Sequence, residues 1–295
     1  MSEKVSFDSQ GLKVAGLLYV PEDAQGALPA VVIGHPVTSV KEQSPANYAE
    51  VLVGAGFVVL TFDASYQGES EGTPRQLEDP VVRSEDVKNA VSYLTTRSEV
   101  DPDRIGAFGI CGSGGYVPFA AQSDKRIKAV ATASGVNIGD LFRADPDALA
   151  EQIEISNAAR TAEARGEANE AVDLLPTTKE QAEQYPDRSM FREAYDFYKT
   201  PRGQNENAPN TLAPTSYDRI AQFDSWEFID AIAPRPLLMF AGSDADTLAH
   251  SQTAIGKAKD PKELVLIEGA SHVDLYDKRV ADVTPELIEF FNDNL

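Results

Sequence analysis

Apolar residues recur along the chain in short runs that have the length and alternation of β-strands. Eight such runs are bounded by turn-forming residues, and they span residues 5–9, 13–20, 30–34, 57–63, 104–110, 127–134, 236–242 and 263–269. From the third run onward, segments of helical periodicity separate them, at 47–55, 82–96, the stretch after Cys111, 250–258 and 285–292. Strands that alternate with helices form parallel sheets covered on both faces. We therefore predict an α/β fold whose eight-stranded sheet is mostly parallel, with an antiparallel start from the first two strands.

The pattern changes between residues 137 and 233, where the sequence no longer alternates strand and helix. An acidic amphipathic helix fits residues 145–175, and a loop rich in Pro and Asn follows at 200–215, which cannot continue a helix or a central strand. An insertion of this size between two core strands is too long to be a simple connection. We expect residues 1–136 and 234–295 to form the core and residues 137–233 to form a helical cap, or lid.

Aromatic residues are prominent in this predicted cap. They either line a substrate pocket or pack the cap onto the core, and they are Phe191, Tyr195, Phe197, Tyr198 and Trp226. Tyr195, Tyr198 and Trp226 are therefore candidates for contact with a substrate.

Charge and composition exclude several classes of protein. With 47 acidic and 26 basic residues the net charge is −21, which disfavours binding to nucleic acids or to anionic membranes. The start of the sequence lacks the pattern of a signal peptide and no apolar run reaches membrane-spanning length, so we expect a cytoplasmic protein. The single cysteine excludes an internal disulfide, and we find neither the spacing of a metal site nor a phosphate-binding loop. We expect no metal and no cofactor, and leave open whether the chain forms a homo-oligomer.

That single cysteine lies in a motif that suggests a nucleophile. The stretch RIGAFGICGSGGY, residues 104–116, ends an apolar strand at Ile110 and continues with small residues before an apolar segment. A nucleophile on a sharp strand-to-helix turn needs such small neighbours, and the start of the helix favours a thiolate. Cys111 directly follows the strand and is the first candidate. Ser113, flanked by glycines, is the competing nucleophile or a substrate contact.

A thiol nucleophile needs a base, and the chain has three histidines. In folds with this elbow the acid follows the nucleophile and the histidine comes last, which selects His272, directly after the last predicted strand. His35 precedes Cys111 and is a candidate substrate contact, and His250 is expected to be a packed or surface residue. The acid should follow the strand at 236–242, where Asp246 is preferred and Asp244 remains the alternative.

Two backbone N–H groups are expected to stabilise the oxyanion. One should belong to Gly112, and the other should come from the loop after the strand at 30–34. Pro36 has no N–H, so Val37 is the first choice. Asp63, at the end of another strand, is interpreted as a carboxylate that stabilises a turn.

Five motifs in this order resemble the α/β-hydrolase superfamily, and more narrowly its dienelactone hydrolase-like and YcjY-like branches. They are GHPVTSVKEQ, FDASYQGESEG, RIGAFGICGSGGY, GSDADT and GASHVDLYD. The resemblance implies Cys111 as nucleophile, His272 as base and Asp246 as the orienting acid. The sequence departs from the family pattern at Ser113, which replaces a glycine, and by a one-residue offset in the acid loop that keeps Asp244 in contention.

These observations predict a hydrolase that acts on a small acyl substrate. Cys111 would attack an ester, thioester or lactone and form an acyl-cysteine intermediate. Some relatives in this branch transfer acyl or polyketide groups, so an acyltransferase or cyclase that uses the same intermediate is one alternative. A binding protein that keeps the fold without catalysis is another.

Overall fold

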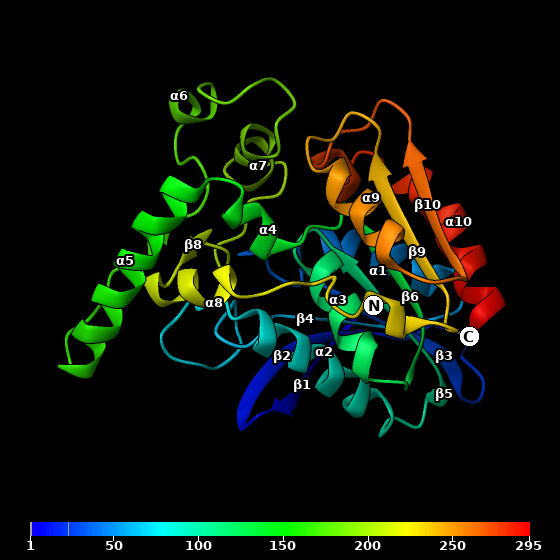
Figure 1. The fold of residues 1–295 in the computed structure, drawn as a ribbon. Coiled ribbons are helices and arrows are strands. Elements are labelled where there is room, and N and C mark those ends of the chain that lie inside the picture. Colours follow the sequence, from blue (N-terminus) through cyan, green and yellow to red (C-terminus); the bar gives the residue numbers. More distant parts are fainter. Residues whose placement is uncertain (1, 23) are drawn as a thin grey trace.

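The computed structural model describes residues 2–22 and 24–295, and it has an eight-stranded sheet at its centre (Figure 1). The strand order is β1-β2-β4-β3-β5-β6-β9-β10. β2 pairs antiparallel with β1 and β4, and the remaining neighbours are parallel. The strands are β1 (Ser2–Ser9), β2 (Leu12–Tyr19), β3 (Leu28–Gly34), β4 (Val58–Phe62), β5 (Val100–Ile110), β6 (Ile127–Ala133), β9 (Leu237–Gly242) and β10 (Lys262–Ile267). This arrangement confirms the predicted mostly parallel sheet with an antiparallel start.

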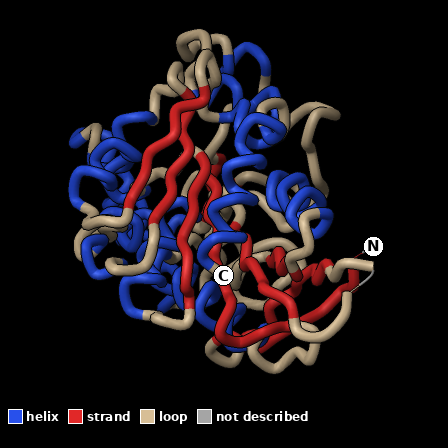
Figure 2. The backbone as a smooth tube through the Cα atoms, turned by 90° about the vertical axis from the view of Figure 1, so that its right-hand side faces the viewer, coloured by secondary structure: helices blue, strands red, loops and turns tan. Residues whose placement is uncertain are grey.

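Helices cover both faces of the sheet, as Figure 2 shows from the side. One face packs against α1 and α10, and the other packs against α2, α3 and α9. Their bounds are α1 (Ser44–Gly54), α2 (Pro80–Leu94), α3 (Ser113–Ser123), α9 (Leu248–Lys257) and α10 (Val280–Asn294). Within the described ranges, none of the helices combines the length and the apolarity that crossing a membrane requires.

The side chains of β3 show why this segment is a central strand. Val31 and Ile33 pack into the core on the α1 and α10 side, whereas Ala30 and Val32 pack into the core on the opposite side. All four are fully buried. Because successive side chains point to opposite faces of a strand, this largely β-branched strand is buried on both of its faces.

The segment between β6 and β9 forms a lobe beside the sheet, drawn from green to yellow in Figure 1. Its elements are α4 (Ile138–Arg143), α5 (Pro146–Ala164), β7 (Val172–Asp173), α6 (Lys179–Ala182), α7 (Met190–Tyr198), β8 (Thr211–Leu212), η1 (Pro214–Ser216), α8 (Tyr217–Ala221) and η2 (Ile229–Ile232). Trp226, Ile229 and Ile232 belong to the main hydrophobic core. The last part of the expected cap therefore packs with the core domain.

Candidate active site

Cys111 lies on a sharp turn between β5 and α3. Its φ is +57°, in the left-handed region that non-glycine residues rarely adopt. Three backbone hydrogen bonds fix the turn: Cys111 N–H donates to Ala133 O (3.0 Å), and Cys111 O accepts from Gly114 N–H (2.8 Å) and Val136 N–H (3.0 Å). A Cβ at Gly114 would lie 2.5 Å from the Cα of Gly135, so a side chain there would push the helix from the neighbouring loop. The sequence thus folds into a strained strand–turn–helix junction, the backbone geometry expected of a nucleophile elbow.

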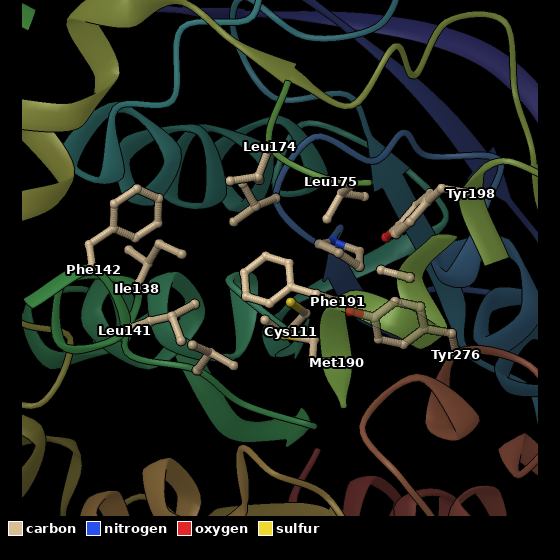
Figure 3. Close-up of a pocket in the computed structure, with 14 residues that line it drawn as sticks. Cys111, Ile138, Leu141, Phe142, Leu174, Leu175, Met190, Phe191, Tyr198 and Tyr276 are labelled. Carbon is tan, nitrogen blue, oxygen red and sulfur yellow. The ribbon is translucent and has the colours of Figure 1, made fainter. Parts of the chain in front are cut away.

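The Cys111 side chain lies in a narrow cavity of about 50 Å³ between the core and the lobe (Figure 3). Core residues contribute to its wall from the ends of β3, β5 and β6 and from the short helix η3 (Val273–Tyr276), and α4, α7 and the segment around β7 supply the remainder. Its lining residues are Pro36, Val37, Cys111, Val136, Ile138, Leu141, Phe142, Leu174, Leu175, Met190, Phe191, Ala194, Tyr198 and Tyr276. Apart from the thiol and two tyrosine hydroxyls, these side chains are apolar.

Three hydrogen-bonding groups lie near the Cys111 sulfur. Burial raises the pKa of the thiol, whereas the Tyr276 hydroxyl and the N–H groups of Gly112 and Val37 lower it. Burial dominates, so the resting side chain is a neutral thiol. The two amides predicted for an oxyanion hole therefore lie beside the predicted nucleophile.

His272 is buried next to the same site. Its Nε2 lies 3.0 Å from the Tyr276 hydroxyl, its Nδ1 lies 2.6 Å from the Thr247 hydroxyl, and its carbonyl accepts a hydrogen bond from Ser134 (2.8 Å). Burial, together with a smaller effect of the nearby His250, lowers the pKa of His272 to about 3. The imidazole is therefore neutral near pH 7 and able to accept a proton.

The expected carboxylate partner of His272 is not found where the sequence suggested. Asp246 accepts a hydrogen bond from the Met190 N–H (2.9 Å), and Asp244 is half exposed with Arg188 3.7 Å away. Among the described residues, neither aspartate is hydrogen bonded to the imidazole. The structure corrects this expectation: the side chain that reaches inward from the same turn is that of Thr247, because the following helix α9 begins there.

Ser113 and His35 lie beneath the elbow rather than in the cavity. The Ser113 hydroxyl donates to the His35 carbonyl (2.6 Å), and Arg83 donates to the same carbonyl (2.7 Å). The His35 ring receives Ala64 N–H at Nε2 (3.0 Å). Burial and the charge of Arg83 lower the pKa of His35 well below its usual value. Both residues hold the loop that carries Val37, which corrects their assignment as substrate contacts.

A buried ion pair holds the same loop from its other side. Lys41 Nζ lies 2.7 Å from the Asp63 carboxylate, which also accepts hydrogen bonds from the Lys41 N–H and the Glu69 N–H, each at 2.8 Å. Burial lowers the pKa of Lys41, but its interaction with Asp63 outweighs this and raises it, so the amine remains charged. Asp63 thus joins two loops, in keeping with its predicted role in a turn.

The aromatic residues of the lobe divide between pocket and core. Tyr198 and Phe191 line the cavity. Tyr195 is half-buried and does not line it, and Trp226 is buried in the main core. Phe197 packs edge-on against Tyr276, with ring centroids 5.4 Å apart. The expectation that Trp226 and Tyr195 contact a substrate is therefore corrected for this cavity, whereas Tyr198 remains a predicted substrate contact.

Two site residues were missed in the sequence. Tyr276 stands four residues after His272, and the short helix η3 (Val273–Tyr276) brings the two side chains together. A spacing of four places residues on one face of a helix, so the pair was detectable in GASHVDLYD. Thr247 ends the motif GSDADT and was overlooked beside its two carboxylates. No group of three His, Cys, Asp or Glu residues within 2–22 and 24–295 could hold a metal ion.

Comparison with known proteins identifies the family. The family model of the dienelactone hydrolase family matches residues 14–227. The chain belongs to this family. It is 37% identical to the uncharacterized protein YcjY of Escherichia coli over 310 residues, covering all of both chains. The crystal structure of the hypothetical protein PA2218 from Pseudomonas aeruginosa matches with a TM-score of 0.91 and 34% identity, over 100% of this chain and 94% of that one.

A third relative has a named activity. The thiohydrolase aneE of Aspergillus aculeatus is 31% identical over 269 residues, which cover 89% of this chain and 83% of aneE. Family membership confirms the resemblance drawn from the five motifs. This dienelactone hydrolase family member is an α/β hydrolase that acts on acyl and ester bonds.

Proposed function

We propose that the protein cleaves thioesters and esters, lactones included, of apolar carboxylic acids through an acyl intermediate on Cys111. One observation carries the proposal: the thiol lies in an apolar cavity with the N–H groups of Gly112 and Val37 beside it. An elbow thiol flanked by two amides suits attack on a carbonyl carbon, because the amides stabilise the oxyanion that forms. A single oxyanion donor contributes roughly 3 kcal/mol to such a reaction.

The pKa values of Cys111 and His272 support a resting state in which both side chains are neutral. The Cys111 pKa is raised and the His272 pKa is lowered to about 3, so a thiolate–imidazolium pair does not form before substrate binds. The thiol loses its proton as sulfur bonds to the carbonyl carbon, and His272 is the final acceptor. The imidazolium then gives its proton to the departing sulfur or oxygen, which leaves as a thiol or an alcohol, and water releases the acyl group from the Cys111 sulfur.

The cavity favours an uncharged acyl group. No charged side chain of the described residues lines it, and an unpaired carboxylate transferred there would lose its hydration without compensation. Within the part of the chain that the structure describes, the buried Tyr198 hydroxyl has no hydrogen-bond partner, which suits it to donate to a substrate oxygen. The volume of about 50 Å³ requires an acyl chain to displace lining side chains, and the flexible thioether of Met190 is suited to that movement.

A paired substrate experiment tests this function. Hexanoyl and adipoyl thioesters of N-acetylcysteamine have the same chain length, but the second ends in a carboxylate. We expect the hexanoyl compound to be cleaved at least about 10²-fold faster, because burying the charge costs several kcal/mol. Intact-mass analysis of quenched enzyme should locate the acyl group on Cys111. A preference for the adipoyl compound would contradict the substrate class.

Two variants separate the candidate nucleophiles. Cys111→Ala should lose both the adduct and turnover, whereas Ser113→Ala should still acquire the adduct on Cys111, since the serine hydroxyl is bonded to His35 O outside the cavity. Full turnover by Cys111→Ala would overturn the covalent mechanism.

Acyl transfer is the second candidate, and the apolar cavity wall favours it because such a wall admits little water. An added alcohol acceptor would then divert the acyl group from hydrolysis. The ratio of transferred to hydrolysed product, measured against acceptor concentration, distinguishes the two functions.

A further inference from the structure

The Tyr276 side chain occupies the space between the proposed nucleophile and the proposed base. Its hydroxyl lies 3.0 Å from His272 Nε2. Tyr276 and Cys111 line the same narrow cavity, and the tyrosine hydroxyl is close enough to the sulfur to lower the pKa of the thiol. In Figure 3 this hydroxyl points from η3 toward the sulfur at the centre of the cavity. Among the described residues, no direct hydrogen bond joins Cys111 to His272. The nucleophile and the base are thus connected through a tyrosine.

We propose that Tyr276 is a catalytic residue that relays the proton of Cys111 to His272. This inference rests on the proposed function, because it assigns a role in forming the acyl-cysteine intermediate. With Nδ1 protonated and donating to the Thr247 hydroxyl, Nε2 has a free lone pair and accepts from the Tyr276 O–H. In the proposed relay, the tyrosine oxygen in turn accepts from the Cys111 S–H.

The relay conserves atoms and charge. As the sulfur bonds to the substrate carbonyl carbon, the carbonyl π pair moves onto its oxygen beside the N–H groups of Gly112 and Val37. The S–H proton passes to the Tyr276 oxygen while the phenolic proton passes to His272 Nε2. Tyr276 stays neutral, His272 becomes imidazolium, and the reverse movement delivers a proton to the leaving group.

Tyr276 is held firmly enough for this role. Its side chain is 2% exposed, and its ring packs edge-on against Phe197 and His272, at centroid distances of 5.4 and 5.6 Å. Helix α1 fixes the backbone of η3, because Asn47 donates to Tyr276 O (2.8 Å) and Tyr48 donates to Leu275 O (2.6 Å). A purely structural tyrosine at this place would not need a hydroxyl beside two reacting groups.

The test uses Tyr276→Phe, which keeps the ring and removes the hydroxyl. Acylation of Cys111 by a hexanoyl p-nitrophenyl ester is followed as a p-nitrophenol burst and by intact mass. We expect the acylation rate to fall about 10²-fold or more, the usual contribution of a positioned acid–base group. Tyr217→Phe is the matched control: it removes a hydroxyl from a mostly buried tyrosine of α8 outside the cavity, and its acylation rate should equal that of the wild type.

Solvent isotope measurements give a readout that a packing role would not change. For the wild type, a plot of acylation rate against the deuterium fraction should be curved, because two protons move together. For Tyr276→Phe the plot should be straight. A straight plot for the wild type overturns the relay even if the variant does not fold. An unchanged acylation rate in folded Tyr276→Phe also overturns it, whereas a wild type that never carries an acyl group on Cys111 refutes the proposed function itself.

Discussion

Replacing Thr247 by valine tests whether a hydroxyl, rather than a carboxylate, orients His272. Valine has nearly the same shape as threonine but cannot accept a hydrogen bond from His272 Nδ1, which lies 2.6 Å from the threonine hydroxyl oxygen. Both side chains are buried, at 5% exposure for Thr247 and 0% for His272. The variant therefore leaves a buried ring nitrogen without its partner and removes the preference for the tautomer whose Nε2 can accept a proton.

The size of the effect follows from that lost hydrogen bond. Leaving a buried neutral donor unsatisfied costs about 1–3 kcal/mol, which corresponds to roughly a 5- to 150-fold loss of kcat/KM if the cost falls on the transition state. A carboxylate that stabilises an imidazolium contributes far more, about 10⁴-fold in serine proteases. The two interpretations thus predict losses that differ by about two orders of magnitude.

The assay compares thioester hydrolysis by three variants. Thr247→Val should lose activity within the range above, and Thr247→Ser should retain most of it because the hydroxyl remains. Asp246→Asn should stay within about threefold of the wild type, since that exposed carboxylate accepts from the Met190 N–H and not from the imidazole. A loss of about 10³-fold or more in Asp246→Asn, with little effect of Thr247→Val, would refute the assignment of Thr247.

Three further predictions concern the frame of the site. Asp63→Ala removes the most buried of the three carboxylates that pair with the Lys41 amine, and it leaves the Lys41 and Glu69 N–H groups without their acceptor. The free energy of unfolding, measured in urea, should therefore fall by about 2 kcal/mol or more; a change below about 1 kcal/mol would contradict a structural role. Gly112→Ala places a methyl group against Val37 Cγ2. Expressed as free energies, the loss of thioesterase activity should therefore exceed the loss of thermal stability. An unchanged rate would argue against this amide as an oxyanion donor. His272 has a folded-state pKa of about 3. Its contribution to stability is therefore complete above pH 6.5 and is lost as the pH falls from 6.5 to 3, by about 1.4 kcal/mol per pH unit. In urea titrations over that window, His272→Gln should lose stability less steeply with falling pH than the wild type, and an equal slope would contradict the low pKa.

The sequence is informative about the fold because its signals are local. The eight apolar runs have a period of two or are buried on both faces, and the small residues around Cys111 can only fit a tight turn, so the sheet and the elbow are predictable from short windows. The choice of Val37 followed from a single chemical fact, the missing N–H of Pro36. Each of these inferences needs only neighbours along the chain.

The errors arose where a role depends on which side chain turns inward. Asp244, Asp246 and Thr247 lie on one turn, and the sequence does not show that α9 begins so that the hydroxyl faces His272. Ser113 stands two residues from Cys111, yet the first turn of α3 directs its hydroxyl to His35 O. Trp226 lies within the inserted segment but packs into the main core. Such orientations depend on tertiary packing that no short window contains.

Under the proposed mechanism, the threonine beside His272 would also explain why a cysteine stands at the elbow. A neutral hydroxyl stabilises an imidazolium less than a carboxylate does, so His272 would be a weak base, but a thiol needs less help than an alcohol because it is more acidic and intrinsically more nucleophilic. Cys111→Ser should therefore be nearly inactive, with no acyl adduct by intact mass. Adding Thr247→Asp to Cys111→Ser should recover part of the acylation rate, because a carboxylate would then face Nδ1. Serine activity close to that of the wild type would show that His272 is already a strong base. An inactive but folded double variant would show that the charge on Nδ1 does not limit the reaction, so the weak base would not be the reason for cysteine at position 111.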